Sequence, residues 1–289
     1  MTSLRDLTAL ARPRIGLLAS AGAGAGWLMA GHGSEGLAPA LPVALAGAFL
    51  LSCGCSALNQ LQERDVDARM ERTKNRPLPA GRMRPAFALA LALAWLAAAA
   101  LALAATPGGW GAAALVPFTV LVYNGLYTPL KRRTPLAMLV GGVAGALPPV
   151  LGFAAGAGLA ATLADHRALL LAGVFYAWQV PHFWLFALSR REQYEAAGLR
   201  VPLHGVGEGR APAALRLWLV GYGAAMLLLP AFGLVSAPAL RWLVAALALG
   251  MICCPGLARG QGRLGFALVN ASLALLLACL AADALGLVA

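Results

Sequence analysis

The sequence predicts an all-α membrane protein, a polytopic bundle of nine transmembrane helices that forms a single domain over residues 1–289. Three observations lead to this fold class: an apolar composition, nine long apolar stretches, and a different cation content in alternate loops. Of the 289 residues, 61% are hydrophobic and 11% are charged, whereas soluble domains are about 45–50% apolar and roughly 25% charged. This composition excludes a water-soluble globule, and it excludes a disordered chain, which would be poor in apolar residues.

Each predicted helix is an apolar stretch close to the length of about 17–25 residues that a bilayer core requires. The first stretch is short, and the eighth contains Pro255. In chain order the stretches are Ile15–Ala30, Ala40–Leu58, Ala86–Ala105, Gly111–Tyr127, Leu136–Ala157, Ala168–Leu188, Ala213–Ala231, Leu240–Leu257 and Leu264–Ala282. Five cysteines, all in apolar runs, predict small buried side chains and no disulfide framework.

Small residues and prolines indicate how some of these helices pack and bend. Three pairs of glycines are spaced four apart and predict close helix packing: Gly22 and Gly26 in the first stretch, and Gly141 and Gly145, and Gly152 and Gly156, in the fifth. The fifth stretch also contains Pro148-Pro149, so we expect it to be kinked. Irregular helices at membrane depth are tolerated where they line a cavity.

The cations lie almost entirely on one side of a nine-helix arrangement. The N-terminus and the even-numbered loops share that side, and of the 22 Lys and Arg residues only Arg167 and Arg241 lie opposite, which leaves 20. The positive-inside rule therefore predicts a cell inner-membrane protein with a cytoplasmic N-terminus and a periplasmic C-terminus. The net charge of +11 reflects this topology and contact with anionic lipid, and it requires no nucleic-acid partner.

A polar run follows the second apolar stretch and begins at Asn59. Asn59, Glu63 and Asp67 are four residues apart, so they share one helical face, while Asp65 points away from it. An amide and two carboxylates are hard oxygen ligands that suit Mg²⁺, whose remaining ligands are water and phosphate. A solvated cap in which Glu63 pairs with an arginine explains the same spacing.

Two groups of cations accompany this run, one shortly after it and one after the fourth apolar stretch. Cations beside carboxylates suit a metal–diphosphate, because Arg and Lys can neutralise the outer phosphate oxygens. Contact with lipid headgroups on the positive side is the alternative. The residues are Arg64, Arg69, Arg72, Lys74 and Arg76 in the first group, and Lys131, Arg132 and Arg133, close to Tyr123 and Tyr127, in the second.

The sixth stretch ends in an aromatic segment, Trp178–Trp184, that contains Gln179 and His182. Polar residues of this kind inside a membrane helix mark a functional site by default, although a histidine with a purely structural hydrogen bond remains an alternative. A second charged segment, Arg190–Gly198, leaves this helix on the same side as the first.

Together these segments resemble the UbiA superfamily of intramembrane prenyltransferases, and within it the protohaem IX farnesyltransferases, or haem O synthases. The similarity extends from Ala11–Ile15 to the ninth stretch. The segments specific to this branch are Asp65–Leu78, Lys131–Pro135, Gly141–Pro149 and Trp178–Gly198. Members of the superfamily are nine-helix bundles with two carboxylate-bearing loops over a central cavity, so the resemblance implies a UbiA-like prenyltransferase fold.

The resemblance also implies an activity: Mg²⁺-dependent transfer of a farnesyl group from farnesyl diphosphate to a vinyl group of haem B, giving haem O for terminal oxidases. It assigns Asn59, Glu63, Asp67 and Glu192 to the metal. It assigns Arg64, Arg69, Lys74, Arg76, Lys131, Arg132, Tyr127, Trp178, Gln179 and His182 to the substrates. His182 would contact either the haem iron or a propionate. The implied surroundings are the lipid bilayer and, as partners, haem A synthase or oxidase assembly factors.

The chain departs from the family pattern at positions that matter for the metal. Glu63 stands where the family has Asp, Gln60 replaces an Asn, and Gln193 stands where the family commonly has Asp. One carboxylate is thus lengthened and another is lost, which makes a weakly active enzyme or a non-catalytic haem-handling paralogue one alternative. A prenyltransferase for an aromatic quinone precursor is another. A transporter is disfavoured, because the charges gather at one face.

Overall fold

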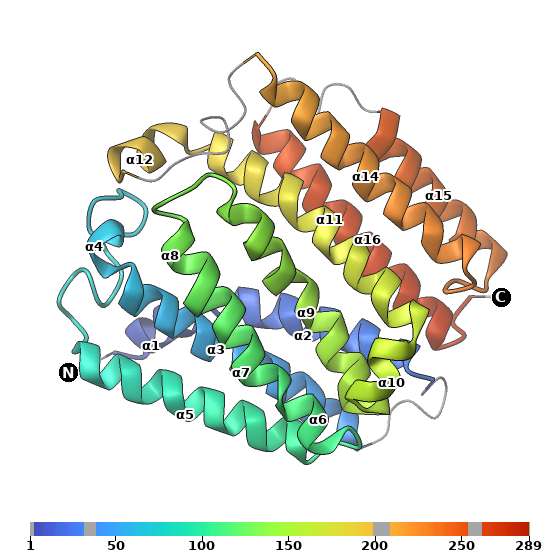
Figure 1. The fold of residues 1–289 in the computed structure, drawn as a ribbon, viewed down its shortest axis with the longest axis horizontal. Helices are drawn as coiled ribbons and strands as arrows, with labels where there is room; N and C mark the ends of the chain where they lie inside the picture. Colours follow the sequence, from blue (N-terminus) through green and yellow to red (C-terminus); the bar gives the residue numbers. More distant parts are fainter. Residues whose placement is uncertain (1–2, 32–38, 199–208, 254–261, 289) are drawn as a thin grey trace.

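The structure is a computed structural model that describes residues 3–31, 39–198, 209–253 and 262–288. Over these ranges the chain is a bundle of helices without β-strands, as the sequence predicts (Figure 1). Short helices α1 (Leu4–Ala11), α4 (Arg64–Asp67), α10 (Leu159–Ala164) and α12 (Arg191–Ala196) lie in the connections. The long helices are α2 (Pro13–Met29), α3 (Ala40–Gln62), α5 (Pro85–Ala104), α9 (Ala137–Ala157), α11 (His166–Leu188), α14 (Ala211–Ala231), α15 (Pro238–Cys253) and α16 (Gly262–Ala284).

The fourth predicted span consists of four consecutive pieces. These are α6 (Gly109–Ala113), α7 (Leu115–Val120), the π-helix η1 (Leu121–Tyr127) and α8 (Thr128–Leu130). A π-helical hydrogen bond reaches one residue further than an α-helical one, and such turns occur frequently at functional sites. The sequence does not predict this irregularity. In contrast, α9 stays helical from Ala137 to Ala157 through both of its prolines.

Seven helices of the described chain are long and apolar enough to cross a membrane. The two other predicted spans are shorter: α2 has 17 residues and α15 has 16. The predicted eighth span continues to Leu257, but residues 254–261 lie outside the described ranges, as do Cys254, Arg200 and Arg259. The polytopic helical membrane class is confirmed, while length and composition support seven of the nine predicted spans.

The helices surround a central space. In the bundle, α2 packs on α3 and α9, α3 on α5, α9 on α11, and α11 on α14 and α16, while α2 also contacts α16 and closes the ring. One apolar core lies among α2, α3, α5 and the fourth span, and another is centred on α11, α14, α15 and α16. Helix α1 lies at one end of the bundle, and the C-terminal end of α16 lies at the other (Figure 1).

Glycines permit a close contact between α2 and α9. A Cβ atom on Gly26 would overlap the backbone oxygen of Pro149, and one on Gly152 would overlap that of Ala23. Backbone atoms cannot turn aside as a flexible side chain can, so the two helices approach this closely only because both positions lack a side chain. The predicted small-residue packing of these stretches is confirmed.

Candidate active site

Asn59, Glu63 and Asp67 form one row, as the sequence predicts. Although α3 ends at Gln62 and α4 begins at Arg64, backbone hydrogen bonds continue through the junction. Glu63 N–H donates to the carbonyl of Asn59 at 2.9 Å, and Asp67 N–H donates to that of Glu63 at 2.7 Å. The three residues are only 2%, 7% and 4% exposed, and all three line one cavity. The row therefore presents three oxygen-bearing side chains at one wall.

Each carboxylate of this row is paired with a cation from another segment. Glu63 Oε1 lies 2.6 Å from Lys131 Nζ, which follows the fourth span. Asp67 Oδ2 lies 2.6 Å from a terminal guanidinium nitrogen of Arg76, and Thr73 Oγ1 donates to the carbonyl of Asp67 at 2.9 Å. Loop 68–84 and the end of the fourth span thus meet at the carboxylates.

The donor atoms of this row fit a hard divalent cation. Asn59 uses Nδ2 to donate to Glu63 Oε2 at 2.8 Å and to Thr128 Oγ1 at 3.2 Å, which leaves Oδ1 without a donor in the described chain. No group of three His, Cys, Asp or Glu side chains gathers among the described residues, so an ion bound at this row would have two carboxylates and the amide oxygen as its protein ligands. Two carboxylates, one amide oxygen and added water or phosphate form the oxygen shell that Mg²⁺ prefers.

Six cations line the cavity, more than the two carboxylates of the row neutralise. They are Arg5, Arg12, Arg14, Arg72, Arg76 and Lys131. Burial lowers the pKa of Lys131, Arg72 and Arg76 below their usual values, and the nearby Arg12 charge acts in the same direction. Arg12 and Arg72 pair with no carboxylate in the described residues, and Arg72 lies 5.6 Å from the ring centre of Phe186. This surplus positive charge suits an anion with several oxygens, such as a diphosphate.

Several predicted site residues do not reach the cavity. The structure pairs Arg132 with Asp65 through two bonds of 2.6 and 2.9 Å, and Arg69 lies 3.8 Å from the same carboxylate. Lys74 pairs with Glu71 at 2.7 Å. Arg69 and Arg132 lie on the solvent side because Asp65 points away from the row, as its spacing predicts, and Lys74 pairs there with the exposed Glu71. The predicted residues that the cavity lining lacks are Arg64, Arg69, Lys74, Arg132 and Glu192.

The predicted aromatic wall does line the cavity. Trp178, Gln179 and His182 project from α11, with the rings of Trp178 and His182 centred 4.5 Å apart. Trp178 Nε1 donates to a backbone carbonyl of α16 at 2.9 Å, which fixes the ring. Tyr127 reaches this wall from η1, its ring centre 5.6 Å from that of Phe183.

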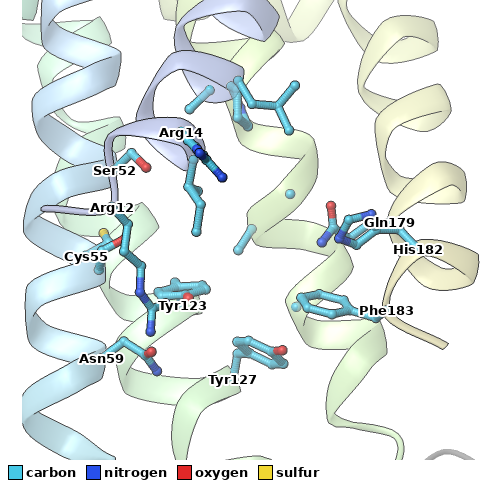
Figure 2. A pocket seen from close by; sticks show the side chains of 18 of the residues that line it. Arg12, Arg14, Ser52, Cys55, Asn59, Tyr123, Tyr127, Gln179, His182 and Phe183 are labelled. Carbon is cyan, nitrogen blue, oxygen red and sulfur yellow. The ribbon is translucent and has the colours of Figure 1, made fainter. Parts of the chain in front are cut away.

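The cavity itself measures about 930 Å³, near the upper end of the range of about 300–1,000 Å³ for small-molecule sites. Figure 2 shows Arg12 and Asn59 on one side of it and Gln179, His182 and Phe183 on the other. Away from the charged row the lining is mostly apolar and includes Ala48, Leu51, Leu147, Leu151 and Phe175, with Arg14 and Ser52 among its polar members (Figure 2). This shape suits a ligand with a charged head and a large apolar body.

The sequence did not single out Arg5, Arg12, Arg14 and Tyr194 as site residues, although all four line the cavity. Arg12 joins α1 to α2 with φ of 51°, the one positive φ at a non-glycine residue of the described chain. Because Arg12 precedes Pro13, the sequence predicts a helix break at this position. It does not predict that the Arg12 side chain points into the cavity. Tyr194 belongs to α12, which packs on α4 through a cluster of Val66, Met70, Ala197 and Tyr194.

Several solved structures share the fold of this chain. The chain aligns over 99% of its length with a digeranylgeranylglyceryl phosphate synthase, covering 100% of that chain (TM-score 0.78, 14% identity). A UbiA homologue from Aeropyrum pernix K1 aligns with a TM-score of 0.72 and 22% identity, over 93% of this chain and 95% of that one. A UbiA homologue from Archaeoglobus fulgidus bound to DMAPP and Mg²⁺ gives a TM-score of 0.69 and 17% identity, over 98% and 100%. At these identities the likeness shows the fold alone.

Sequence comparison is more specific. The protohaem IX farnesyltransferase of Geobacter sulfurreducens is 44% identical over 249 residues, which are 85% of this chain and 88% of that protein. The protohaem IX farnesyltransferase of Oleidesulfovibrio alaskensis is 39% identical over 282 residues, 98% of this chain and 97% of that protein. The model of the UbiA prenyltransferase family matches residues 17–259. The chain therefore belongs to the UbiA prenyltransferase family and, within it, groups with the protohaem IX farnesyltransferases.

Proposed function

We propose that this chain transfers the farnesyl group of farnesyl diphosphate to a vinyl group of protohaem IX, which yields haem O and diphosphate. The observation that carries the proposal is the cavity, in which a cation-rich row of oxygen ligands adjoins a wide apolar and aromatic chamber. One end matches a diphosphate, and the other accommodates a prenyl tail and a porphyrin.

In the reaction, the bond between C1 of the farnesyl group and the diphosphate oxygen breaks, and its electron pair leaves with the diphosphate. A bond then forms between C1 and the vinyl group, and water adds to the resulting cation and releases a proton. The developing negative charge on the leaving group would be stabilised by Arg76, Lys131, Arg12 and Arg72, which are already fixed around it. No strong base is required.

The row of Asn59, Glu63 and Asp67 would hold a divalent metal, for which we propose Mg²⁺. When bound, the metal neutralises diphosphate oxygens and so assists the departure of the leaving group. Glu192, exposed on α12, would add negative charge to the second loop without entering this row. Full turnover in excess chelator would refute the metal requirement; we expect loss of activity that added Mg²⁺ restores.

The apolar chamber has two tasks. Tyr127, Trp178 and Phe183 present flat faces to the substrates, and the aliphatic lining excludes water from the carbocation until the new bond has formed. Gln179 supplies a polar group at the wall. The solvent-side cations Arg64, Arg69, Lys74 and Arg132 would then support the loops and the lipid interface rather than the diphosphate.

For localisation we propose the cell inner membrane, with the N-terminus and the charged loops in the cytoplasm and the C-terminus in the periplasm. The proposal rests on the 20-to-2 distribution of cations. Since haem O is hydrophobic and serves oxidases, haem A synthase or oxidase assembly factors are the partners that we propose for its onward transfer.

The test is mass spectrometry of haem extracted from membranes with and without the chain, in a host that lacks its own haem farnesyltransferase. We expect farnesylated hydroxyethyl haem only when the chain is present. Isotope-labelled farnesyl diphosphate should deliver its label to the product. A prenylated phenolic acid in place of haem O would support a quinone-precursor enzyme, whereas bound haem without diphosphate release would indicate a non-catalytic paralogue.

A further inference from the structure

His182 is the one histidine among the residues that line the cavity. Its ring is held among three aromatic rings, with centroid distances of 4.5 Å to Trp178, 5.8 Å to Phe183 and 4.9 Å to Phe266. No acidic side chain of the described residues contacts it. The ring is therefore fixed in place by packing. Which ring nitrogen carries the proton then decides whether the other nitrogen can accept a hydrogen bond or bind a metal.

A second residue decides the position of that proton. His182 Nδ1 lies 3.0 Å from Asn270 Oδ1 of α16. Asn270 uses its Nδ2 to donate to the backbone carbonyl of Phe266, so the amide cannot be reversed without losing that bond. A carbonyl oxygen only accepts hydrogen bonds. His182 Nδ1 must then be the donor, and in the neutral ring Nε2 carries a lone pair.

The lone pair on Nε2 has no partner in the described protein. None of the described residues donates a hydrogen bond to it, and His182 faces the cavity on the side opposite Asn59 (Figure 2). A histidine that donates Nδ1–H to a fixed oxygen while Nε2 remains open is the arrangement found at protein metal ligands, where the outer hydrogen bond sets the tautomer and increases ligand basicity.

We infer that Nε2 of His182 is an axial ligand to the iron of the haem acceptor, with Asn270 as its positioning residue. This inference rests on the proposed function, since it takes haem as the substrate. Histidine is a common axial ligand of haem iron. A propionate contact is disfavoured, because a carboxylate needs a hydrogen-bond donor and Nε2 of this tautomer only accepts.

Iron ligation would also orient the acceptor. The His182 wall lies across the cavity from the row that holds the leaving group, so an iron bound there places the porphyrin between the aromatic rings and the diphosphate site. The macrocycle can then pack against the flat faces of Trp178 and Phe183. The chain would thereby select an iron porphyrin over its metal-free form.

The experiment uses the full chain in lipid nanodiscs with two probes, ferric protohaem IX and metal-free protoporphyrin IX. In His182→Ala we expect the histidine-ligand signature in the Soret and electron paramagnetic resonance spectra to disappear and affinity for haem to fall by about tenfold or more. Affinity for metal-free protoporphyrin should stay unchanged. Imidazole added to the solution should restore the spectrum, because it can occupy the vacated space.

Three further variants make the result specific. His166→Ala removes an exposed histidine from the other end of α11 and should leave both probes unaffected. His182→Gln keeps a hydrogen-bonding side chain and should still lose the iron signature. Asn270→Leu should retain the histidine ligand but lower the iron–histidine stretching frequency and weaken haem binding by about tenfold.

Two results would overturn the inference. Equal loss of both porphyrins in His182→Ala would indicate a contact with the propionates or the ring. An unchanged iron spectrum in that variant would assign the iron to another group, such as Cys55 or a cavity tyrosine. In contrast, a wild-type chain that neither binds haem nor farnesylates it would refute the proposed function itself, so the two failures are distinguishable.

Discussion

Arg132 and Asp65 form a two-pronged ion pair, with nitrogen–oxygen distances of 2.6 and 2.9 Å, outside the cavity and only two residues from Asp67. Both side chains are about half exposed, at 41% and 53%, so the pair contributes little to stability. It joins the end of the fourth span to α4 on the side away from the cavity. Asp65 therefore lies on the solvent side and Asp67 at the cavity, although only one residue separates them in the sequence. Substitutions at these two positions can be compared directly.

We expect Asp67→Ala to lower farnesyl transfer by orders of magnitude with little loss of folding, because a proposed metal ligand at the cavity wall is removed. Asp65→Ala, which removes the solvent-side partner of Arg132, should retain near-normal turnover. Production of haem O by purified protein, measured by mass spectrometry, provides the readout. Equal effects of the two substitutions would move the metal away from the row of Asn59, Glu63 and Asp67.

A second prediction concerns pH. Burial lowers the pKa of Lys131 below that of an exposed lysine, although its pairing with Glu63 offsets part of this change. Lys131 is charged below its pKa, so we expect KM for farnesyl diphosphate to rise as the pH passes upward through that value. Lys131→Arg should move this alkaline rise to higher pH, since guanidinium holds its proton. Lys74→Arg, on the solvent side, is the control; an identical shift there would exclude Lys131 as the titrating group.

The second charged loop gives a third prediction. On α12, Gln193 Oε1 is buried without a hydrogen-bond donor in the described chain, Glu192 is exposed, and Glu195 pairs with Arg191 at 2.8 Å. We therefore expect Gln193→Asp to change the rate of prenyl transfer more than Glu192→Gln or Glu195→Gln. A large loss in Glu192→Gln, with Gln193→Asp unchanged, would instead show that Glu192 supplies the charge that this loop requires.

Stability can be tested where α2 and α9 meet. Gly152→Ala would force a Cβ atom against the backbone oxygen of Ala23, and overpacking of this kind costs about 1–3 kcal/mol. We expect a lower melting temperature in detergent. Gly173→Ala is the matched control, since its added Cβ would meet no atom within 4 Å apart from the adjoining residues and backbone of its own helix, and it should melt close to wild type.

Topology is the fifth prediction. A reporter fused after Ala289 should be periplasmic, and one inserted at Thr134, in the basic connection after the fourth span, should be cytoplasmic. Phosphatase and fluorescent-protein activities measured in parallel identify the side. A cytoplasmic reporter after Ala289 would mean an even number of crossings, in conflict with the positions of α1 and the C-terminal end of α16 at opposite ends of the bundle.

The row of Asn59, Glu63 and Asp67 could be predicted because a four-residue spacing is a local property of a helix, and that helix continues through the α3–α4 junction. Which of the neighbouring cations face the cavity could not be predicted. Arg72 and Arg76 face the cavity while Arg69 and Lys74 face solvent, and this division depends on how loop 68–84 turns after α4, which no periodicity encodes. Arg12 was missed for the same reason: its left-handed backbone conformation, not its sequence neighbours, directs the side chain inward.

The pairing of each carboxylate with its own cation has a thermodynamic consequence. A metal that arrives alone must displace Lys131 and Arg76 from Glu63 and Asp67, and a diphosphate that arrives alone must draw those cations away from their carboxylates. When the two arrive together, the metal takes the oxygens and the diphosphate takes the cations, so neither displaced group is left without a partner. Each ligand must then raise the affinity for the other by the same factor. If the row binds metal and diphosphate as proposed, the resting ion pairs would couple the two binding events and favour the metal–diphosphate complex over either component.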